Sequence, residues 1–268
     1  MKKVFIFILL SFSTLSLQAQ DFEVGGWLGT SVYFGDLNTN FSFKRPGVAG
    51  GIVGRYNFNP RVAVKASASY AHVSYDDALS PFVFQRTRNL DFSSHIIEGT
   101  FQLEFNFLKY EHGSDDHFWT PYVFGGLTVF YFNPRTKFND EWVALQPLGT
   151  EGQAKNSEYS RTQPAFAFGG GLKFDLNYAW SINFEVSGRY LFTDFLDDVS
   201  GVYPDFDDLA TQRGNLAVLL SDPSYQVFES QIGEPGRQRG NSKDNDSYNL
   251  IGISLLYNFA SIKCPTKF

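Results

Sequence analysis

The sequence predicts an all-β protein: a closed, eight-stranded antiparallel transmembrane β-barrel with long extracellular loops. Three observations predict it. One stretch alternates apolar and polar residues, similar stretches recur along the chain, and the connections between them alternate between short and long. Strands of this kind suit a wall that has lipid on one side and a polar lumen on the other.

The clearest alternation lies in Ser93–Phe107. One set of alternate positions is apolar or glycine: Ile97, Gly99, Phe101, Leu103, Phe105 and Phe107. The set between them is polar: Glu98, Thr100, Gln102, Glu104 and Asn106. Because successive side chains of a strand point to opposite faces, this stretch has one apolar and one polar face.

The same kind of pattern recurs along the chain. Eight amphipathic stretches are predicted as strands: Phe22–Phe34, Val48–Phe58, Arg61–Tyr75, Ser93–Phe107, Pro121–Phe132, Ala165–Asp175, Trp180–Phe192 and Tyr248–Phe259. Each is long enough to cross a bilayer at a tilt, which takes about 9–11 residues. Eight is also the smallest common strand number of outer-membrane barrels.

The connections divide into two kinds. The expected periplasmic turns are Asn57–Pro60, Leu108–Trp119 and Leu176–Ala179. The expected outer loops are Gly35–Gly47, Asp76–Asp91, Asn133–Pro164 and Thr193–Ser247. Short inner turns and long outer loops are the usual arrangement in such barrels, and favour a barrel over a soluble sandwich. Aromatic residues at the ends of the stretches, among them Tyr33, Tyr75 and Tyr122, predict girdles at the two membrane interfaces.

The N-terminus predicts export. Lys2 and Lys3 precede an apolar run that is too short for a spanning helix, and a Ser/Thr-rich neck leads to Ala19. We therefore expect a signal peptide over 1–19, an outer-membrane barrel over 20–259 and a periplasmic C-terminal tail over 260–268. Both termini of the mature chain would face the periplasm of a Gram-negative cell. The single cysteine, Cys264, can form no intrachain disulfide.

The polar faces predict a charge network inside the barrel. Its expected members are Arg55, Lys65, Glu98, Glu104, Lys173, Glu185 and Arg189. Eight strands enclose little more than packed side chains, and an unpaired buried charge is costly. The pattern therefore favours an ion-pair plug over a narrow gated pore, and leaves the pairing open.

Little in the sequence points to catalysis. His95 follows Ser93 and Ser94 near the expected outer end of a strand, which leaves a lipid-modifying barrel enzyme as a remote alternative. A nucleophilic site needs three groups in contact, so we expect no enzyme and no cofactor. No small-molecule substrate motif is evident. The net charge of −6 and the lack of a basic patch argue against nucleic acid.

The last long loop is rich in acids. Asp194, Asp197 and Asp198 open it, and clustered oxygens can bind Ca²⁺. Solvation of a loop explains them equally well, so we expect no metal and keep these three as a weak candidate. Apolar runs in the same loop, such as Leu216–Leu220, predict a short helix or hairpin that packs over the barrel mouth or against a partner.

Several junctions between strands and loops carry a family resemblance. They are Tyr33–Asn38, Arg55–Asn57, Pro121–Gly126, Phe130–Pro134, Arg189–Ser200, Arg239–Asn241 and Asp246–Tyr248. With them the chain resembles the PorG-like outer-membrane proteins of Bacteroidetes over essentially its whole mature length. Arg189–Ser200 is the most specific of these segments.

The resemblance implies a part in protein secretion by the type IX secretion system. A PorG-like barrel would anchor the periplasmic ring built from the PorK lipoprotein and PorN to the outer membrane. The implied partners are outer-membrane lipid and PorK/PorN-like ring proteins. The longest and most charged periplasmic turn is the expected contact: Lys109, Tyr110, Glu111, His112, Asp115, Asp116 and His117. The alternative is a porin-like or OmpA/OmpX-like structural barrel that binds ligands through its outer loops.

Overall fold

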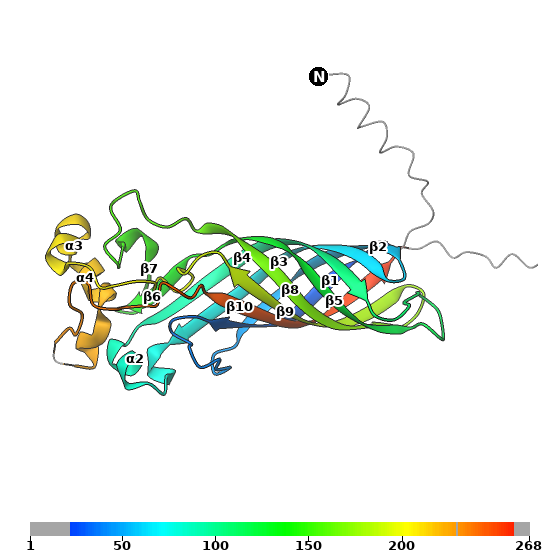
Figure 1. Ribbon diagram of the computed structural model, residues 1–268, viewed down its shortest axis with the longest axis horizontal. Coiled ribbons are helices and arrows are strands. Elements are labelled where there is room, and N and C mark those ends of the chain that lie inside the picture. The colour runs from blue at the N-terminus through cyan, green and yellow to red at the C-terminus, as the bar shows by residue number, and fades with distance from the viewer. Residues whose placement is uncertain (1–21, 229, 260–268) are drawn as a thin grey trace, which may run out of the picture.

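The computed structural model describes residues 22–228 and 230–259. Within them, eight long strands close into an antiparallel barrel (Figure 1). These strands are β1 (Phe22–Phe34), β2 (Gly47–Asn59), β3 (Val62–Asp76), β4 (Asp91–Asn106), β5 (Trp119–Tyr131), β8 (Thr162–Asp175), β9 (Trp180–Leu191) and β10 (Ser247–Asn258). Consecutive barrel strands pair with each other, and β1 pairs with β10 to close the ring. The predicted fold is confirmed.

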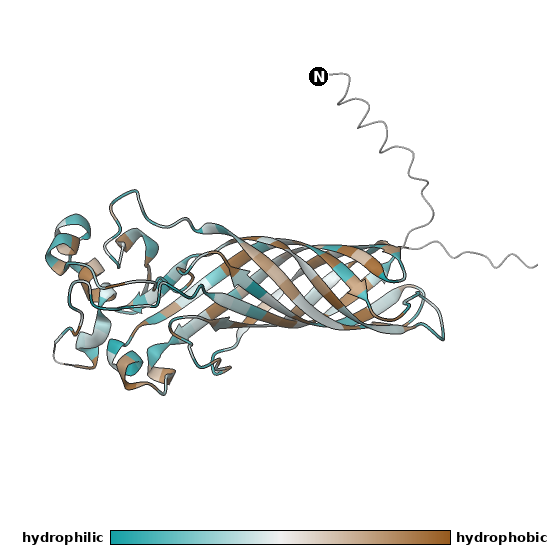
Figure 2. Ribbon diagram, viewed as in Figure 1, coloured by the Kyte–Doolittle hydropathy of each residue, from teal (hydrophilic) through white to brown (hydrophobic). Residues whose placement is uncertain are grey.

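The barrel wall follows the alternation of the sequence. Along β4 the side chains alternate between buried and exposed, with Glu98 and Glu104 inside and Phe101 outside. Exposed apolar side chains continue around the wall, for example Leu28 and Ile52. Figure 2 shows these brown positions along the barrel, whereas teal predominates beyond its end. An apolar outer face on a closed sheet with no free edge is what a lipid environment requires.

The long connections gather at one end of the barrel, which we call the loop end. We call residues 35–46, 77–90, 132–161 and 192–246 the cap. The cap contains η2 (Asp77–Leu79), α2 (Val83–Arg88), β6 (Pro134–Phe138), β7 (Glu141–Ala144), η3 (Gln146–Leu148), α3 (Phe206–Arg213), α4 (Asn215–Ser221) and η4 (Pro223–Gln226). Of the helix or hairpin predicted in the last loop, the structure shows a helix, α4, over the apolar run Leu216–Leu220. The hairpin of β6 and β7 was not predicted.

The first and last described residues lie at the opposite end, together with the short turns, and we call this the turn end (Figure 1). The predicted signal peptide, 1–19, and the tail, 260–268 with Cys264, lie outside the described residues.

The apolar core lies at the loop end of the lumen. Buried side chains of the strand ends, such as Phe92 and Phe130, pack there against cap residues such as Leu196 and Leu220. Tyr33 and Tyr75 belong to this core, and Tyr122 is buried in the lumen, so the prediction of these three as girdle residues is wrong. The parity of a position along its strand, not its nearness to the strand end, decides which way an aromatic side chain points.

Candidate functional site: the lumen charge network and the long turn

Glu104 is the centre of the charge network in the lumen. Its carboxylate lies 2.8 Å from Arg55 Nε, 3.4 Å from Lys65 Nζ and 2.6 Å from Lys173 Nζ. Arg55 and Lys65 are directly opposite each other on β2 and β3, where two like charges repel. Glu104 faces both from β4 and is fully buried, so it compensates the repulsion where water cannot.

The network continues on both sides of Glu104. Arg55 Nη1 lies 3.0 Å from Glu23 Oε2, and Lys65 also pairs with Glu185. Tyr122 donates a hydrogen bond of 2.6 Å to Glu185. The side chains that form these contacts come from β1, β2, β3, β5 and β9, so the network ties together strands from around the barrel.

A second group of charges lies nearer the loop end. Arg189 donates two hydrogen bonds to Glu98, from Nε at 3.2 Å and from Nη2 at 2.7 Å. Tyr248 donates to the same carboxylate. A bidentate pair of this kind fixes both side chains in one geometry.

All seven residues predicted for the network point into the lumen and form these ion pairs. The structure adds Glu23, which sequence reasoning missed. Among the described residues the four predicted bases therefore meet four acids: Glu23, Glu98, Glu104 and Glu185. Glu23 directly precedes the outward-facing Val24 in β1, so its side chain points to the lumen. This alternation is the sequence signal that could have identified Glu23.

A small cavity separates the two groups of charges. It measures about 40 Å³ and is lined by Lys65, Glu185 and Arg189 among others. This volume has room for only a few water molecules. The lumen is therefore filled by side chains along this part of its length.

The long turn, residues 107–118, closes the turn end. Within it, Tyr110 and His112 point into the barrel mouth and are nearly inaccessible to solvent. His112 Nδ1 lies 2.7 Å from Asp175 Oδ1, and its Nε2 lies 3.4 Å from Glu23 Oε1. Burial lowers the pKa of His112, but the interactions with the carboxylates of Asp175 and Glu23 outweigh it and raise the pKa to about 9. His112 is therefore an imidazolium that joins the turn to the lumen network.

The predicted partner-binding set divides into two parts. Lys109, Asp115 and Asp116 are exposed, and Glu111 and His117 are half-buried. The side chains of Tyr110 and His112 are instead buried and help to close the barrel. Alternation along a turn could not reveal this, since Asp175 lies 63 residues away from His112.

The three aspartates of the last loop do not form a metal site. Asp197 accepts hydrogen bonds from Tyr33 and from the Val199 backbone N–H. Asp198 accepts from Thr150 and Tyr159. Among the described residues, no group of three or more His, Cys, Asp or Glu side chains is placed to hold a metal ion.

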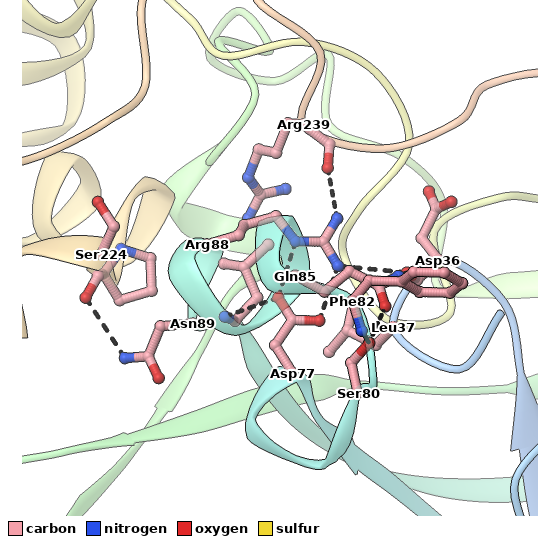
Figure 3. A network of polar contacts seen from close by, with 12 residues as sticks. Asp36, Leu37, Asp77, Ser80, Phe82, Gln85, Arg88, Asn89, Ser224 and Arg239 are labelled. Carbon is pink, nitrogen blue, oxygen red and sulfur yellow. Dashed lines mark hydrogen bonds and ion pairs between the residues drawn. The ribbon is translucent and has the colours of Figure 1, made fainter. Parts of the chain in front are cut away.

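Two buried arginines hold the cap together (Figure 3). Arg88 donates from Nε and Nη2 to Asp77, at 2.7 and 2.8 Å, and also donates to the backbone carbonyls of Asp36 and Arg239. Arg239 in turn lies 3.0 Å from Glu151. These contacts join the first, second, third and last long loops.

Several segments that carry the family resemblance meet in the same place. The Asn241 backbone N–H donates to Asp36 Oδ2 at 2.8 Å. Tyr33 donates to Asp197 and lies 3.3 Å from Asp246 Oδ1. These four segments, Tyr33–Asn38, Arg189–Ser200, Arg239–Asn241 and Asp246–Tyr248, thus belong to the base of the cap, whereas Arg55–Asn57 and Pro121–Gly126 lie on β2 and β5 nearer the turn end.

His95 does not assemble a hydrolase site with its neighbouring serines. Its ring faces outward, and Nδ1 lies 2.6 Å from the Tyr70 hydroxyl. Ser93 instead contacts His72, at 2.8 Å, and Ser94 is buried on the inner face. His95 therefore does not form a catalytic pair with Ser93 or Ser94.

The fold and its apolar outer wall define the class of protein, a small transmembrane β-barrel of the outer-membrane type. The chain belongs to the DUF6089 family, which is described as a domain of unknown function and whose model matches residues 2–231. A search of curated proteins found no match.

Solved structures of small barrels are similar to the chain. The N-terminal barrel domain of OprF from Pseudomonas aeruginosa is 13% identical, with 89% of this chain and 97% of that chain covered and a TM-score of 0.39. Ail of Yersinia pestis in complex with sucrose octasulfate is 10% identical, with coverage of 90% and 99% and a TM-score of 0.44. OprG of Pseudomonas aeruginosa is 10% identical, with coverage of 90% and 97% and a TM-score of 0.43.

Among the described residues, no helix is both long enough and apolar enough to cross a membrane.

Proposed function

We propose that this protein is a non-enzymatic outer-membrane anchor for the periplasmic ring of the type IX secretion system, as its resemblance to PorG-like proteins implies. In this proposal the turn end faces the periplasm and the cap faces the outside. The partners are PorK/PorN-like ring proteins, and the barrel itself transports nothing.

The observation that carries the proposal is the filled lumen. The ion pairs around Glu104 and the inserted His112 fill the turn-end half of the barrel. The cavity between the two groups of charges measures only about 40 Å³. The apolar core occupies the loop-end half. A barrel filled in this way offers its ends, not its interior, to other molecules.

The turn end offers a surface suited to a protein partner. Asp115 and Asp116 are exposed in the long turn, and Lys109 pairs with Glu111 in its first half at 3.0 Å. Exposed Tyr178 lies in the neighbouring turn, where its ring crowds the α-carbon of Gly113. The charged side chains of the turn could bind a partner without a rearrangement of the backbone, because His112 already fixes the turn.

The experiment is affinity purification of tagged protein from outer membranes. Asp115→Lys with Asp116→Lys should lose the ring lipoprotein and its partner. The matched control is Asp207→Lys with Asp208→Lys, an exposed acidic pair in the cap. Both variants must show wild-type heat-modifiable mobility on gels, which reports a closed barrel. Absence of ring proteins from the wild-type sample would refute the proposal.

The ordered cap favours a second candidate, an OmpA/OmpX-like barrel that binds through its outer loops. Arg88 and Arg239 fix loops that solvation alone would leave free. In the same experiment, loss of a surface ligand with the Asp207/Asp208 variant, while the turn variant behaves as wild type, would favour this candidate.

A further inference from the structure

One side of the loop end displays apolar side chains where a cap exposed only to water would bury them. We call Phe41, Phe43, Phe82, Val83 and Phe84 the rim patch; each is between 41% and 71% exposed. They come from the first loop and from the start of α2. The two segments are in contact, because Gln85 Nε2 donates to the Asp36 carbonyl and Lys44 Nζ donates to the Leu79 carbonyl.

The backbone at Phe41 is held in a conformation that suits display. Its φ of 50° lies in the left-handed region, which a bulky residue rarely adopts. Asn38 enforces the turn: its Nδ2 donates to the carbonyls of Tyr33 and Ser42, and its Oδ1 accepts from the Ser42 N–H. Folding alone would favour glycine at Phe41, both for the backbone and for the exposed ring.

Three cations surround the rim patch: Lys44, Arg45 and Arg86, which we call the rim cations. All are exposed. Lys44 and Arg86 donate to backbone carbonyls at 3.0 and 2.8 Å, not to carboxylates, and Arg45 lies 3.8 Å from Asp76. The rim is therefore locally positive on a chain whose net charge is −6.

The rim patch continues the lipid-facing wall. β2 begins at Gly47, two residues after Arg45, and its outward-facing Val48 and Ile52 are about two-thirds exposed. Next to them on β3 and β4, Tyr70 and His95 form a hydrogen-bonded pair on the outer face. Passing along the wall toward the cap, a lipid would meet apolar side chains first, then hydroxyl and imidazole groups, then cations.

We infer that the rim patch and the rim cations form a binding site for membrane lipids with anionic, phosphate-bearing headgroups. The rings of the patch insert beside the acyl chains at the edge of the leaflet, and the cations contact phosphate oxygens. Continuity with the apolar wall selects a lipid over a soluble phosphate compound, and the excess of cations selects an anionic headgroup. The site goes beyond ring anchoring and does not depend on it.

The test uses full-length protein reconstituted with equal amounts of phosphatidylglycerol and phosphatidylcholine of identical acyl chains, and native mass spectrometry of the lipids retained. The wild type should prefer phosphatidylglycerol. Lys44→Gln, Arg45→Gln and Arg86→Gln together should reduce that preference by more than tenfold, given about fivefold per cation near a membrane surface. The charge-preserving set Lys44→Arg, Arg45→Lys and Arg86→Lys should keep it.

The matched control replaces three exposed or peripheral cations elsewhere in the cap, Lys137, Arg237 and Lys243, by glutamine and should behave as wild type. Equal retention of the two lipids by the wild type would overturn the inference. So would an undiminished preference in the rim-cation variant.

Phe41→Gly tests the patch separately. It relieves the strained backbone and removes the exposed ring, so the barrel should be at least as stable in detergent while retention of both lipids falls. Unchanged lipid retention in this variant would contradict the insertion of the ring.

Discussion

The lumen and the base of the cap both bury many charged side chains, but they balance them differently. In the lumen each carboxylate of the network meets a cation, and Glu104 meets three. At the base of the cap, Asp197 and Asp246 contact Tyr33, Asp194 lies near both of them, and acids outnumber bases.

The difference appears in the protonation of the two regions. In the cap, burial raises the pKa of Asp194 to about 8 and that of Asp36 to about 6. Burial and the neighbouring carboxylates raise the pKa of Asp197 and Asp246 well above the usual value. Paired charges remain ionised without water, whereas crowded acids must keep protons. Ion pairs therefore stabilise the lumen, whereas the stability of the cap depends on pH.

The largest expected effect follows from Glu104→Gln. It leaves Arg55, Lys65 and Lys173 without their shared carboxylate, and breaking a buried pair costs about 3–5 kcal/mol. The free energy of unfolding, measured by urea titration in vesicles with the gel shift as readout, should fall by that amount. The exposed Glu141→Gln is the control. A loss no larger than that of the control would mean that the network does not hold the barrel.

Arg88→Met should act mainly on the cap. It leaves Asp77 buried without its cation, at a cost of about 3 kcal/mol, while the lumen pairs stay intact. Limited proteolysis should cut the cap faster and leave a heat-modifiable barrel. Arg237→Met, an exposed cap arginine, should be cut at the wild-type rate. Cooperative loss of the whole barrel would show that cap and lumen are one unit.

The pH dependence of the cap has a definite sign. A carboxyl whose pKa is raised on folding contributes stability at acid pH, which is lost as the pH rises from its unfolded pKa of about 4 toward the folded value. For Asp194 that window extends from about 4 to about 8. Protection of the cap against proteolysis should fall across it, by at most about 1.4 kcal/mol per pH unit for one proton.

Asp194→Asn supplies the control for this effect, since the amide mimics the protonated acid. The variant should keep more protection at pH 8 than the wild type and show a shallower decline. An identical decline in both proteins would show that Asp194 does not cause the pH dependence of the cap.

His112→Gln should have the smallest effect, about 2 kcal/mol at neutral pH, because Glu23 keeps Arg55 and Asp175 keeps the Gly113 N–H. His112 has a raised pKa, so its contribution is complete below about 6.5 and is lost as the pH rises through about 9. An NMR titration of the imidazole should give a pKa near 9. A value near 6.5 would show that His112 does not make its two ionic contacts.

The strands were predictable because their signal is local. The predicted stretch Ser93–Phe107 corresponds to β4, Asp91–Asn106. The face of each residue follows from its position in the alternation, because successive side chains of a strand point to opposite faces. The contacts were not predictable, because they depend on distance in space. Nothing near His112 in the chain indicates Asp175, and nothing near Asp36 indicates Asn241. The alternation along β1 could have placed Glu23 in the lumen, but the signal is weak because Glu23 is a single acid in a glycine-rich strand.

Paired side chains and the apolar core close the lumen. Conductance of the purified wild-type protein in planar bilayers tests this closure most directly. The structure predicts no current steps above the leak of the bilayer, because ion pairs and the apolar core fill the path. Stable, ion-selective channels in the wild-type protein would show that the lumen is open.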